Sequence, residues 1–322
     1  MKQKVADYIA DYIAKWGIRD VFTVTGGGAM HMNDAFGHHP GLHCTYQHHE
    51  QACAMAAEAY ARVDNRMAAV CVTTGPGATN AITGILGAWM DSIPMIVFSG
   101  QARDATTVPA SGLRLRSMGV QECNIVPVVT PLTKFAHMIV HPENIRYYLE
   151  KALYMAVNGR PGPVWLDIPL DVQGAVIETD ELNGYDPSEN PEEKPAEIPD
   201  GIIEQILNKI ETSERPVLAP GNGVRLAGAI NDFHRLVEIL GVPVVTGMSS
   251  VDALESENLY FVGRSGGTGN RPGNFAVQNS DVLLSIGNRQ GFAQTGFQYQ
   301  DWARESYTIL NDIDENELHK PN

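Results

Sequence analysis

The feature that most restricts the fold of this chain is a repeated alternation of short apolar segments with helical patterns. Val5, Ile9 and Ile13 recur at helical spacing, and Gly17 is the expected end of that helix. Further apolar segments and helical patterns then follow one another, an order typical of a parallel sheet that helices cover on both faces. The expected strands are 20–26, 42–47, 68–74, 94–100 and 163–169, and the expected helices are 50–63, 78–90 and 144–157.

A second series of the same kind begins near residue 201. The preceding stretch, 178–200, is acidic and carries prolines at regular intervals, which predicts an extended linker. We therefore expect the α/β class, with two doubly wound parallel-sheet domains at residues 1–177 and 201–322. Another helical pattern starts just before the last residue, so we expect the second domain to be truncated at its C-terminal end. Its expected strands are 215–221, 242–247, 281–287 and 306–314.

The formal charge of −15 at pH 7 argues against two classes of partner. An acidic chain repels a nucleic-acid backbone and an anionic membrane surface, so we expect neither as a partner. Asp7 and Asp11 interrupt the apolar pattern at the N-terminus, which argues against a secretory signal, and no apolar run approaches the length of a membrane span. The four cysteines form no Cys-x-x-Cys pair, and a cytoplasmic location fits that usage.

Three Gly-x-Gly clusters, at residues 26–28, 75–77 and 221–223, are candidates for a dinucleotide-binding turn. That fingerprint requires a third glycine three residues further on, and each cluster lacks it. Tight turns between strands and helices explain each cluster taken singly. The residues at the third position are His31, Asn80 and Leu226.

Five histidines gather between residues 38 and 49 and invite comparison with a zinc site. Their spacing matches no pair of ligands on a helix, and adjacent histidines on an extended segment point to opposite faces. We therefore expect no metal site there. The histidines are His38, His39, His43, His48 and His49.

Glu50 stands where a predicted strand gives way to a predicted helix. Two interpretations are open from the residues alone. A glutamate in a first turn is favoured by the helix dipole, which is a structural role. A carboxyl group at this place could instead be an acid–base group.

Four segments of the first half resemble, in the same order, the signature motifs of acetohydroxyacid synthases, a family of thiamine-diphosphate enzymes. They are HEQACAMAAEAYAR (49–62), TTGPGATNAITGILGAWMDSIPMIVFSGQ (73–101), VQECNIVPVVTPLTKFA (120–136) and GRPGPVWLDIPLDV (159–172). Two segments of the second half, VQNSDVLLSIGNRQ (277–290) and NDIDENELHK (311–320), resemble the family more loosely. The resemblance covers nearly the whole chain and is weakest in the linker.

The resemblance implies a role for each matched residue. Glu50 matches the glutamate that hydrogen-bonds N1′ of the thiamine pyrimidine and so promotes loss of the C2 proton, and Gln121 would reach the reacting centre. Residues lining the thiamine cofactor would be Gly75, Pro76, Gly77 and Asn80, joined by Gly27, Gly28 and Ala29 from a neighbouring subunit. Residues on flavin-binding elements would be Arg160, Gly221, Gly223, Arg289 and Asp312.

Three departures from the family pattern limit these expectations. Val120 replaces a phenylalanine that helps shape the substrate pocket, and GRSGG (263–267) replaces a Gly-Met-His-Gly element, so flavin adenine dinucleotide is less secure than thiamine diphosphate. No Gly-Asp-Gly occurs in these 322 residues, although the family holds Mg²⁺ and the diphosphate on such a motif in a third domain. We expect that Mg²⁺ site to lie outside this chain, and the chain alone to be inactive.

The resemblance implies a 2-keto acid decarboxylating carboligase that takes pyruvate and transfers its two-carbon unit to a second carbonyl, forming acetolactate in branched-chain amino acid biosynthesis. A relative that uses another acceptor, such as a keto sugar, is an alternative. A non-catalytic nucleotide-binding module is a second. The family also implies a homodimer or homotetramer, and the apolar surface of 78–90 suits such packing.

Overall fold

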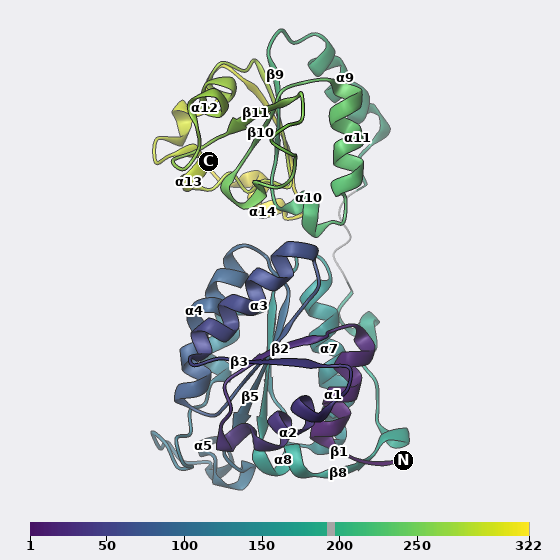
Figure 1. Ribbon diagram of the computed structural model, residues 1–322, viewed down its shortest axis with the longest axis vertical. Helices are drawn as coiled ribbons and strands as arrows, with labels where there is room; N and C mark the ends of the chain where they lie inside the picture. The colour runs from purple at the N-terminus through teal and green to yellow at the C-terminus, as the bar shows by residue number, and fades with distance from the viewer. Residues whose placement is uncertain (192–196, 322) are drawn as a thin grey trace. The chain divides into compact units, whose positions relative to one another are not determined.

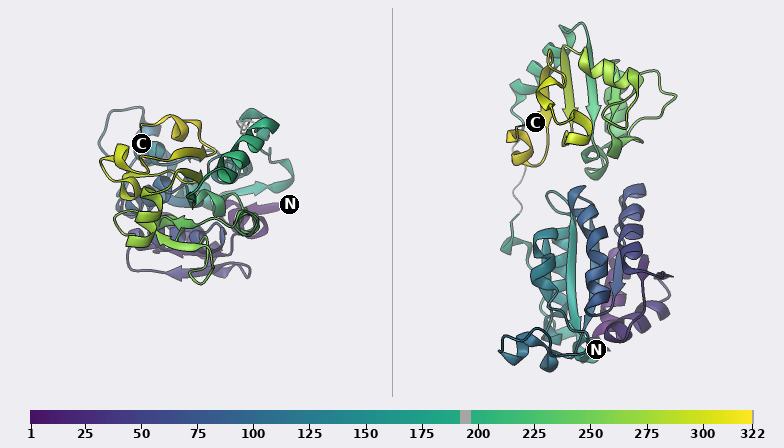
Figure 2. Two further views of the ribbon diagram at one scale, coloured as in Figure 1. Left: turned by 90° about the horizontal axis from the view of Figure 1, so that it is seen from above. Right: turned by 90° about the vertical axis from the view of Figure 1, so that its left-hand side faces the viewer.

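The computed structural model describes residues 1–191 and 197–321. These residues form two compact units, Met1–Glu193 (unit 1) and Lys194–Asn322 (unit 2), which Figures 1 and 2 show from three directions. No helix in the described ranges is long and apolar enough to cross a membrane.

Unit 1 is built on a six-stranded sheet in which every neighbouring pair is parallel. The spatial order is β3-β2-β4-β5-β7-β6, so the chain reverses its direction of travel across the sheet between β3 and β4. The strands are β2 (Asp20–Thr23), β3 (His43–Tyr46), β4 (Ala69–Val72), β5 (Met95–Gln101), β6 (Phe135–Met138) and β7 (Pro163–Pro169).

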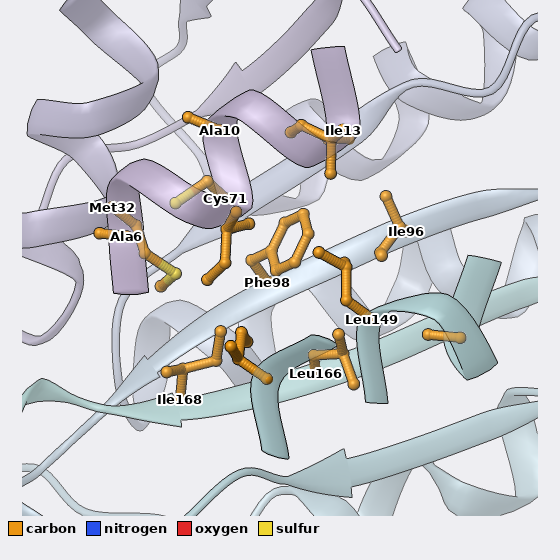
Figure 3. Close-up of a cluster of buried hydrophobic side chains, with 14 of the residues drawn as sticks. Ala6, Ala10, Ile13, Met32, Cys71, Ile96, Phe98, Leu149, Leu166 and Ile168 are labelled. Atoms are coloured by element: carbon orange, nitrogen blue, oxygen red, sulfur yellow. The ribbon is translucent and has the colours of Figure 1, made fainter. Parts of the chain in front are cut away.

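Helices cover both faces of this sheet, as Figure 1 shows. On one face, Ile13, Met32 and Leu149 pack with Phe98 and Leu166 of the central strands in the core seen in Figure 3. The opposite face lies under α3 and α4. The helices are α1 (Val5–Trp16), α2 (Met30–His38), α3 (Glu50–Asp64), α4 (Pro76–Met90), α5 (Val108–Ser111), α6 (Val126–Val129), α7 (Ile145–Val157) and α8 (Leu170–Gly174).

Small residues bring α3 and α4 unusually close. A Cβ atom added to Gly84 would stand 2.5 Å from Cβ of Ala54 and 2.8 Å from the backbone nitrogen of Met55. Any larger side chain at Gly84 would separate the helices. The close approach matters for the site because α3 begins at Glu50 and α4 begins at Pro76.

The first strand of unit 1, β1 (Lys2–Lys4), pairs with β8 (Val176–Glu178) in an antiparallel ribbon. Beyond β8 the chain stays on the unit, with Leu182 and Tyr185 buried. Lys151 lies over the Tyr185 ring, 5.5 Å from its centroid. The expected linker over 178–200 is therefore interrupted by packed structure, because its apolar residues find partners on α7. Residues 192–196 of that linker lie outside the described residues.

Unit 2 is a five-stranded parallel sheet in the order β11-β10-β9-β12-β13. Phe233 and Val237 of α11 pack on one face, and Val277 of α12 packs on the other. The strands are β9 (Pro216–Pro220), β10 (Val244–Thr246), β11 (Phe261–Arg264), β12 (Val282–Ile286) and β13 (Tyr307–Asn311). The helices are α9 (Asp200–Glu211), α10 (Gly223–Leu226), α11 (Ile230–Leu240), α12 (Arg271–Gln278), α13 (Phe292–Thr295) and α14 (Glu315–His319).

The expected fold class is confirmed, since both large sheets are parallel and lie between helices. The sequence patterns missed β6 and β11. The segment FAHM of β6 is only half-buried, and FVGR of β11 contains a glycine, so neither has the continuous apolar run of the other strands.

Candidate active site

The matched residues of unit 1 gather at the carboxyl ends of neighbouring parallel strands. The loop 24–29 follows β2, the turn 73–77 follows β4, and Gln101 ends β5. Because β2, β4 and β5 are adjacent, these three segments leave the sheet side by side. Ligands of open α/β sheets bind at this edge.

Glycines allow the backbone of loop 24–29 and of the turn 73–77 to pack closely against the side chain of Thr73. A Cβ atom added to Gly26 would stand 2.4 Å from Cβ of Thr73, and one added to Gly77 would stand 2.7 Å from its Cγ2. The backbone nitrogen of Gly28 donates to Oγ1 of Thr73 at 3.0 Å. A Cβ atom on Gly27, in contrast, would meet nothing within 4 Å. Gly26, Gly28 and Gly77 are therefore packed against Thr73, whereas the space beside Gly27 is open.

Glu50 begins α3 and turns its carboxylate toward α4. Its Oε2 accepts from Nδ2 of Asn80 at 3.0 Å, and its Oε1 lies 3.4 Å from the point where a Cβ of Gly77 would stand. The start of α3 is capped by the ring of His49, whose Nδ1 accepts from the backbone nitrogen of Gln51 at 3.1 Å. The structure thus brings Glu50, Gly77 and Asn80 together and leaves Glu50 half-buried.

Gly75 and Gln121 meet where the turn after β4 touches the segment after α5. Both have positive φ, 58° at Gly75 and 55° at Gln121. The next residue, Pro76, occupies the first turn of α4, where its missing N–H costs nothing. Gln121 itself is exposed, so its side chain is available to a bound molecule.

Glu122 fixes the segment that carries Gln121. Its buried carboxylate accepts from the backbone nitrogens of Val108, Met118 and Gly119 at 2.5, 2.8 and 2.9 Å. Burial alone would raise the pKa of Glu122, but these backbone donors outweigh it and hold the pKa below its usual range.

A buried polar network lies directly beneath the turn after β4, and the sequence patterns did not single it out. Asp167 of β7 accepts from Ser99 at 2.6 Å and from Gln101 at 2.9 Å. Trp165 donates to Ser99 at 2.8 Å. Burial raises the pKa of Asp167 to about 7, although the hydrogen bonds from Ser99 and Gln101 oppose that rise. A single charged residue inside the apolar segment PVWLDIP was the available signal.

Arg160 does not join these residues. It precedes β7, and its Nε donates at 2.8 Å to Oγ of Ser92, which precedes β5. β5 and β7 are parallel, with Met95 opposite Pro163, so Arg160 lies at the amino ends of the strands. Glu50 and Gly75 lie at the opposite edge of the sheet.

The matched residues of unit 2 lie at the carboxyl ends of β9, β12 and β13. A Cβ atom added to Gly221 would stand 2.1 Å from the carbonyl oxygen of Gly287, and Gly223 donates to that same oxygen at 2.9 Å. These glycines therefore serve contact between two loops. Arg289 is exposed, and Asp312 accepts from the backbone nitrogen of Asp314 at 3.0 Å.

Two asparagines of the same loops carry buried amide nitrogens without a hydrogen-bond partner. They are Nδ2 of Asn222 and Nδ2 of Asn288. Unsatisfied buried donors are rare in native folds, and an acceptor on a bound molecule is one way to satisfy them.

Four of the five clustered histidines have hydrogen-bond partners that are not histidines. His39 contacts Asp11 at 3.1 Å and His43 contacts Asp20 at 3.2 Å. Among residues 1–191 and 197–321, no three His, Cys, Asp or Glu side chains are grouped to hold a metal ion. All four cysteines are free thiols.

Comparison with known proteins agrees with this geometry. Residues 3–126 match the thiamine pyrophosphate enzyme N-terminal TPP binding domain, which contains the loops and Glu50 described above. Residues 203–322 match the thiamine pyrophosphate enzyme central domain. The chain therefore belongs to the thiamine pyrophosphate enzymes and carries their N-terminal and central domains.

Individual relatives narrow the class. The chain is 32% identical over 275 residues to the acetolactate synthase large subunit of Lactococcus lactis, covering 85% of this chain and 46% of that protein. It is 32% identical over 322 residues to the enzyme of the same name from Haemophilus influenzae, covering 98% and 53%. It is 33% identical over 305 residues to the acetolactate synthase large subunit of Corynebacterium glutamicum, covering 93% of this chain and 46% of that protein. The acetohydroxyacid synthase resemblance is thus confirmed, and the chain spans about half the length of the relatives it matches.

Proposed function

We propose that this chain supplies the pyrimidine side of a thiamine-diphosphate site in an acetolactate synthase-like carboligase. The observation that carries the proposal is the position of the Glu50 carboxylate, which faces the glycine turn after β4 and receives one hydrogen bond from Asn80. The second and third observations are the matched family domains and the similar acetolactate synthase large subunits.

The residues present fit the pyrimidine half of that cofactor. A flat heterocycle needs a surface free of side chains and a carboxyl group for its ring nitrogen. Gly27 offers open space, and Gly77 faces the Glu50 carboxylate with no side chain between them. Gly27, Gly28, Ala29, Gly75, Pro76, Gly77 and Asn80 are the residues that we propose to line it.

The chemistry assigns one task to each group. Thiamine diphosphate, when bound, supplies a carbon acid that adds to a ketone and accommodates the electrons left by decarboxylation. Glu50 would hold and exchange a proton at N1′ of the pyrimidine, and Asn80 keeps one carboxylate oxygen oriented for that exchange. Gln121 would contact the substrate from the segment fixed by Glu122.

The substrate class follows from the relatives and remains part of the proposal. Pyruvate would be decarboxylated and its two-carbon unit transferred to a second 2-keto acid. The exposed Val120 stands beside Gln121 where the family has a larger aromatic side chain, so a bulkier acceptor such as a keto sugar is the alternative.

Flavin binding has weaker support. Asn222 and Asn288 present unpartnered donors at the edge where Gly221, Gly223 and Asp312 lie, which suits a nucleotide. Gly221 and Gly223 already serve loop packing, however, so their presence alone does not require a ligand. Arg289 completes the flavin set that we propose for unit 2, and no catalytic step depends on it. A flavin contact of Arg160, in unit 1, rests on the family resemblance alone.

Three further expectations belong to the same proposal. Mg²⁺ and the diphosphate would be held by groups outside these 322 residues, as the family resemblance implies. The protein would be a homodimer or homotetramer that buries the outer surface of α3 and α4. The free thiols favour the cytoplasm as its location. We also propose domain boundaries at 1–177 and 201–322.

The decisive experiment is Glu50→Gln in the native protein that contains these residues. If Glu50 is the acid–base group, deuterium exchange at C2 of thiamine diphosphate and acetolactate formation should both slow by roughly 10²–10⁴-fold. If it is only a first-turn residue, activity should persist and stability should fall by at most about 1 kcal/mol. Glu143→Gln, another glutamate in a first turn, is the matched control and should leave both rates unchanged. Wild-type exchange in Glu50→Gln would sink the proposal.

A further inference from the structure

Gln101 is a buried side chain that hydrogen-bonds both the turn proposed to hold the cofactor and the segment proposed to contact the substrate. It ends β5 and is 2% exposed. Its Oε1 accepts from Oγ1 of Thr74 at 2.6 Å and from the backbone nitrogen of Ala102 at 3.0 Å. Its Nε2 donates to the carbonyl oxygen of Cys123 at 2.8 Å and to Asp167 at 2.9 Å. All four hydrogen-bonding positions of the amide are used.

These contacts fix which way the amide points. Turning it by 180° would set its NH₂ group against the N–H of Ala102 and its oxygen against two acceptors, Cys123 and Asp167. Asp167 is itself held in place by Ser99, at 2.6 Å. The carboxylate of Asp167 therefore orients the Gln101 amide. The amide then presents its oxygen to Thr74 and its remaining N–H to the carbonyl of Cys123.

The two loop contacts lie next to the residues that the proposed function uses. Thr74 precedes Gly75, and Cys123 follows Gln121 by two residues. The same segments meet again where the Gln121 carbonyl closes on Gly75. Two points of contact, one of them a single buried amide, fix the position of one segment relative to the other.

We propose that Gln101 is a positioning residue that holds the 73–77 turn and the 121–123 segment in one fixed arrangement, with Asp167 orienting its amide. This proposal rests on the proposed function only for the statement that the 73–77 turn holds the cofactor and that Gln121 contacts the substrate. Gln101 would touch neither cofactor nor substrate, because it is buried beneath both loops. Its effect on the reaction would pass through the spacing of the cofactor turn and Gln121.

Backbone hydrogen–deuterium exchange of the whole chain tests this without any cofactor. Thr74→Val removes one donor and should speed exchange of residues 73–77 by roughly threefold to tenfold, the usual worth of one hydrogen bond. Thr74→Ser keeps the hydroxyl and should restore the wild-type rate. Gln101→Met removes the whole bridge and should speed exchange in 73–77 and 121–123 together.

The matched control is Thr133→Val. Thr133 is as buried as Thr74, at 6% exposure for each, and its hydroxyl donates to the Val129 carbonyl at 2.9 Å. This variant should leave residues 73–77 at the wild-type rate. If it speeds them as much as Thr74→Val does, or if Gln101→Met leaves either segment protected, the proposal fails. Should Gln101→Met not fold, the contrast between Thr74→Val and Thr74→Ser decides.

A second readout separates this proposal from the proposed function. In the thiamine-dependent enzyme, Thr74→Val should lower kcat by roughly threefold to tenfold and leave KM for pyruvate within about twofold, since it shifts the cofactor turn and not the substrate. An equal change in KM would contradict the positioning role. Absence of thiamine-dependent activity in the wild type would defeat the proposed function, and the exchange measurements would still decide the role of Gln101.

Discussion

The carbonyl oxygen of Gln121 lies 1.8 Å from the point at which a Cβ atom on Gly75 would stand. No side chain fits between these two residues, so a glycine is required for the segment of Gln121 to close on the turn after β4. The backbone of Gly75, at φ 58° and ψ −113°, is also one that residues with a Cβ avoid.

Gly75→Ala should therefore destabilise the protein by roughly 3–5 kcal/mol, the sum of backbone strain and steric overlap. Gly112→Ala is the matched control, because Gly112 also has positive φ, 65°, but a Cβ there meets nothing within 4 Å. It should cost only about 1–2 kcal/mol. Urea unfolding gives the free energy of unfolding of both variants. Equal losses of stability would mean that the Gln121 segment can move away from residue 75 at little cost.

Asp167 gives the stability of the protein a pH dependence opposite to that of an ordinary salt-bridged carboxylate. Its pKa is about 7 in the fold, above its ordinary value of 3.8, so the folded state binds the proton more tightly than the unfolded chain. Stability from this group is present at low pH and is lost as pH rises toward 7. Asp167→Asn does not titrate, so between pH 5.5 and 8 wild type should lose about 2 kcal/mol relative to the variant.

Asp281→Asn is the control for that pH series. Hydrogen bonds from Ser213 and from the backbone nitrogens of Glu214 and Arg215 lower the pKa of Asp281 to about 2, against some cost of burial. Asp281 is therefore ionised in both states throughout the window, and its variant should run parallel to wild type. Parallel curves for Asp167→Asn as well would mean that Asp167 is ionised in the fold.

Glu122→Gln should loosen the segment that ends at Gln121. An amide offers one accepting oxygen where the carboxylate offers two, so at least one backbone N–H of Val108, Met118 or Gly119 loses its partner. Trypsin cleavage after the exposed Arg114 and Arg116 should accelerate by roughly tenfold. The exposed Glu181→Gln should leave the rate unchanged.

The lowered pKa of Glu122 determines the pH at which wild type and Glu122→Gln should be compared. Stability from this carboxylate is present above its unfolded pKa and is lost as pH falls through the lower folded value. Wild type should therefore keep its resistance to trypsin at neutral pH. Cleavage of wild type as fast as that of Glu122→Gln at neutral pH would show that the anchor does not hold the segment.

Self-association should depend on the outer surface of α3 and α4. Met55, Leu86 and Met90 of these helices are 42%, 39% and 51% exposed, an apolar surface suited to a second copy of the chain. Leu86→Glu should weaken association at least tenfold by sedimentation equilibrium, since it buries a charge in the interface. Ile239→Glu, an exposed apolar residue of unit 2, is the control. Equal effects of both variants would remove α3 and α4 from the interface.

Local patterns predicted most of the strands of the two large sheets but not their arrangement. The segment PVWLDIP was expected to be a strand and is β7, residue for residue. Its place between β5 and β6 could not be read from the chain, because β6 precedes it in sequence and is the edge strand in space. Order within a sheet is decided by long-range packing, which a local pattern does not record.

The same limit applies to the site. Motif resemblance singled out Glu50 and Gly77, and the structure brings them together. The contact between Gln101 and Asp167 joins residues 66 positions apart and depends on β5 lying beside β7. No sequence pattern at Gln101 or Asp167 predicts contact with the other residue. The hydrogen-bond network of Ser99, Gln101 and Asp167 could therefore be found only from the structure.

The ribbon of β1 and β8 gives unit 1 a particular mechanical behaviour. Lys2 lies opposite Glu178, so the chain enters and leaves the ribbon at the same side. A force that pulls Lys2 and Glu178 apart separates the strands one pair at a time instead of shearing all pairs at once. Once Lys4 and Val176 have parted, the load passes to α1 through Val5, whose nitrogen donates to Ala175 at 2.9 Å. A motor that threads the chain from its N-terminal side would therefore begin to unravel unit 1 by opening this ribbon.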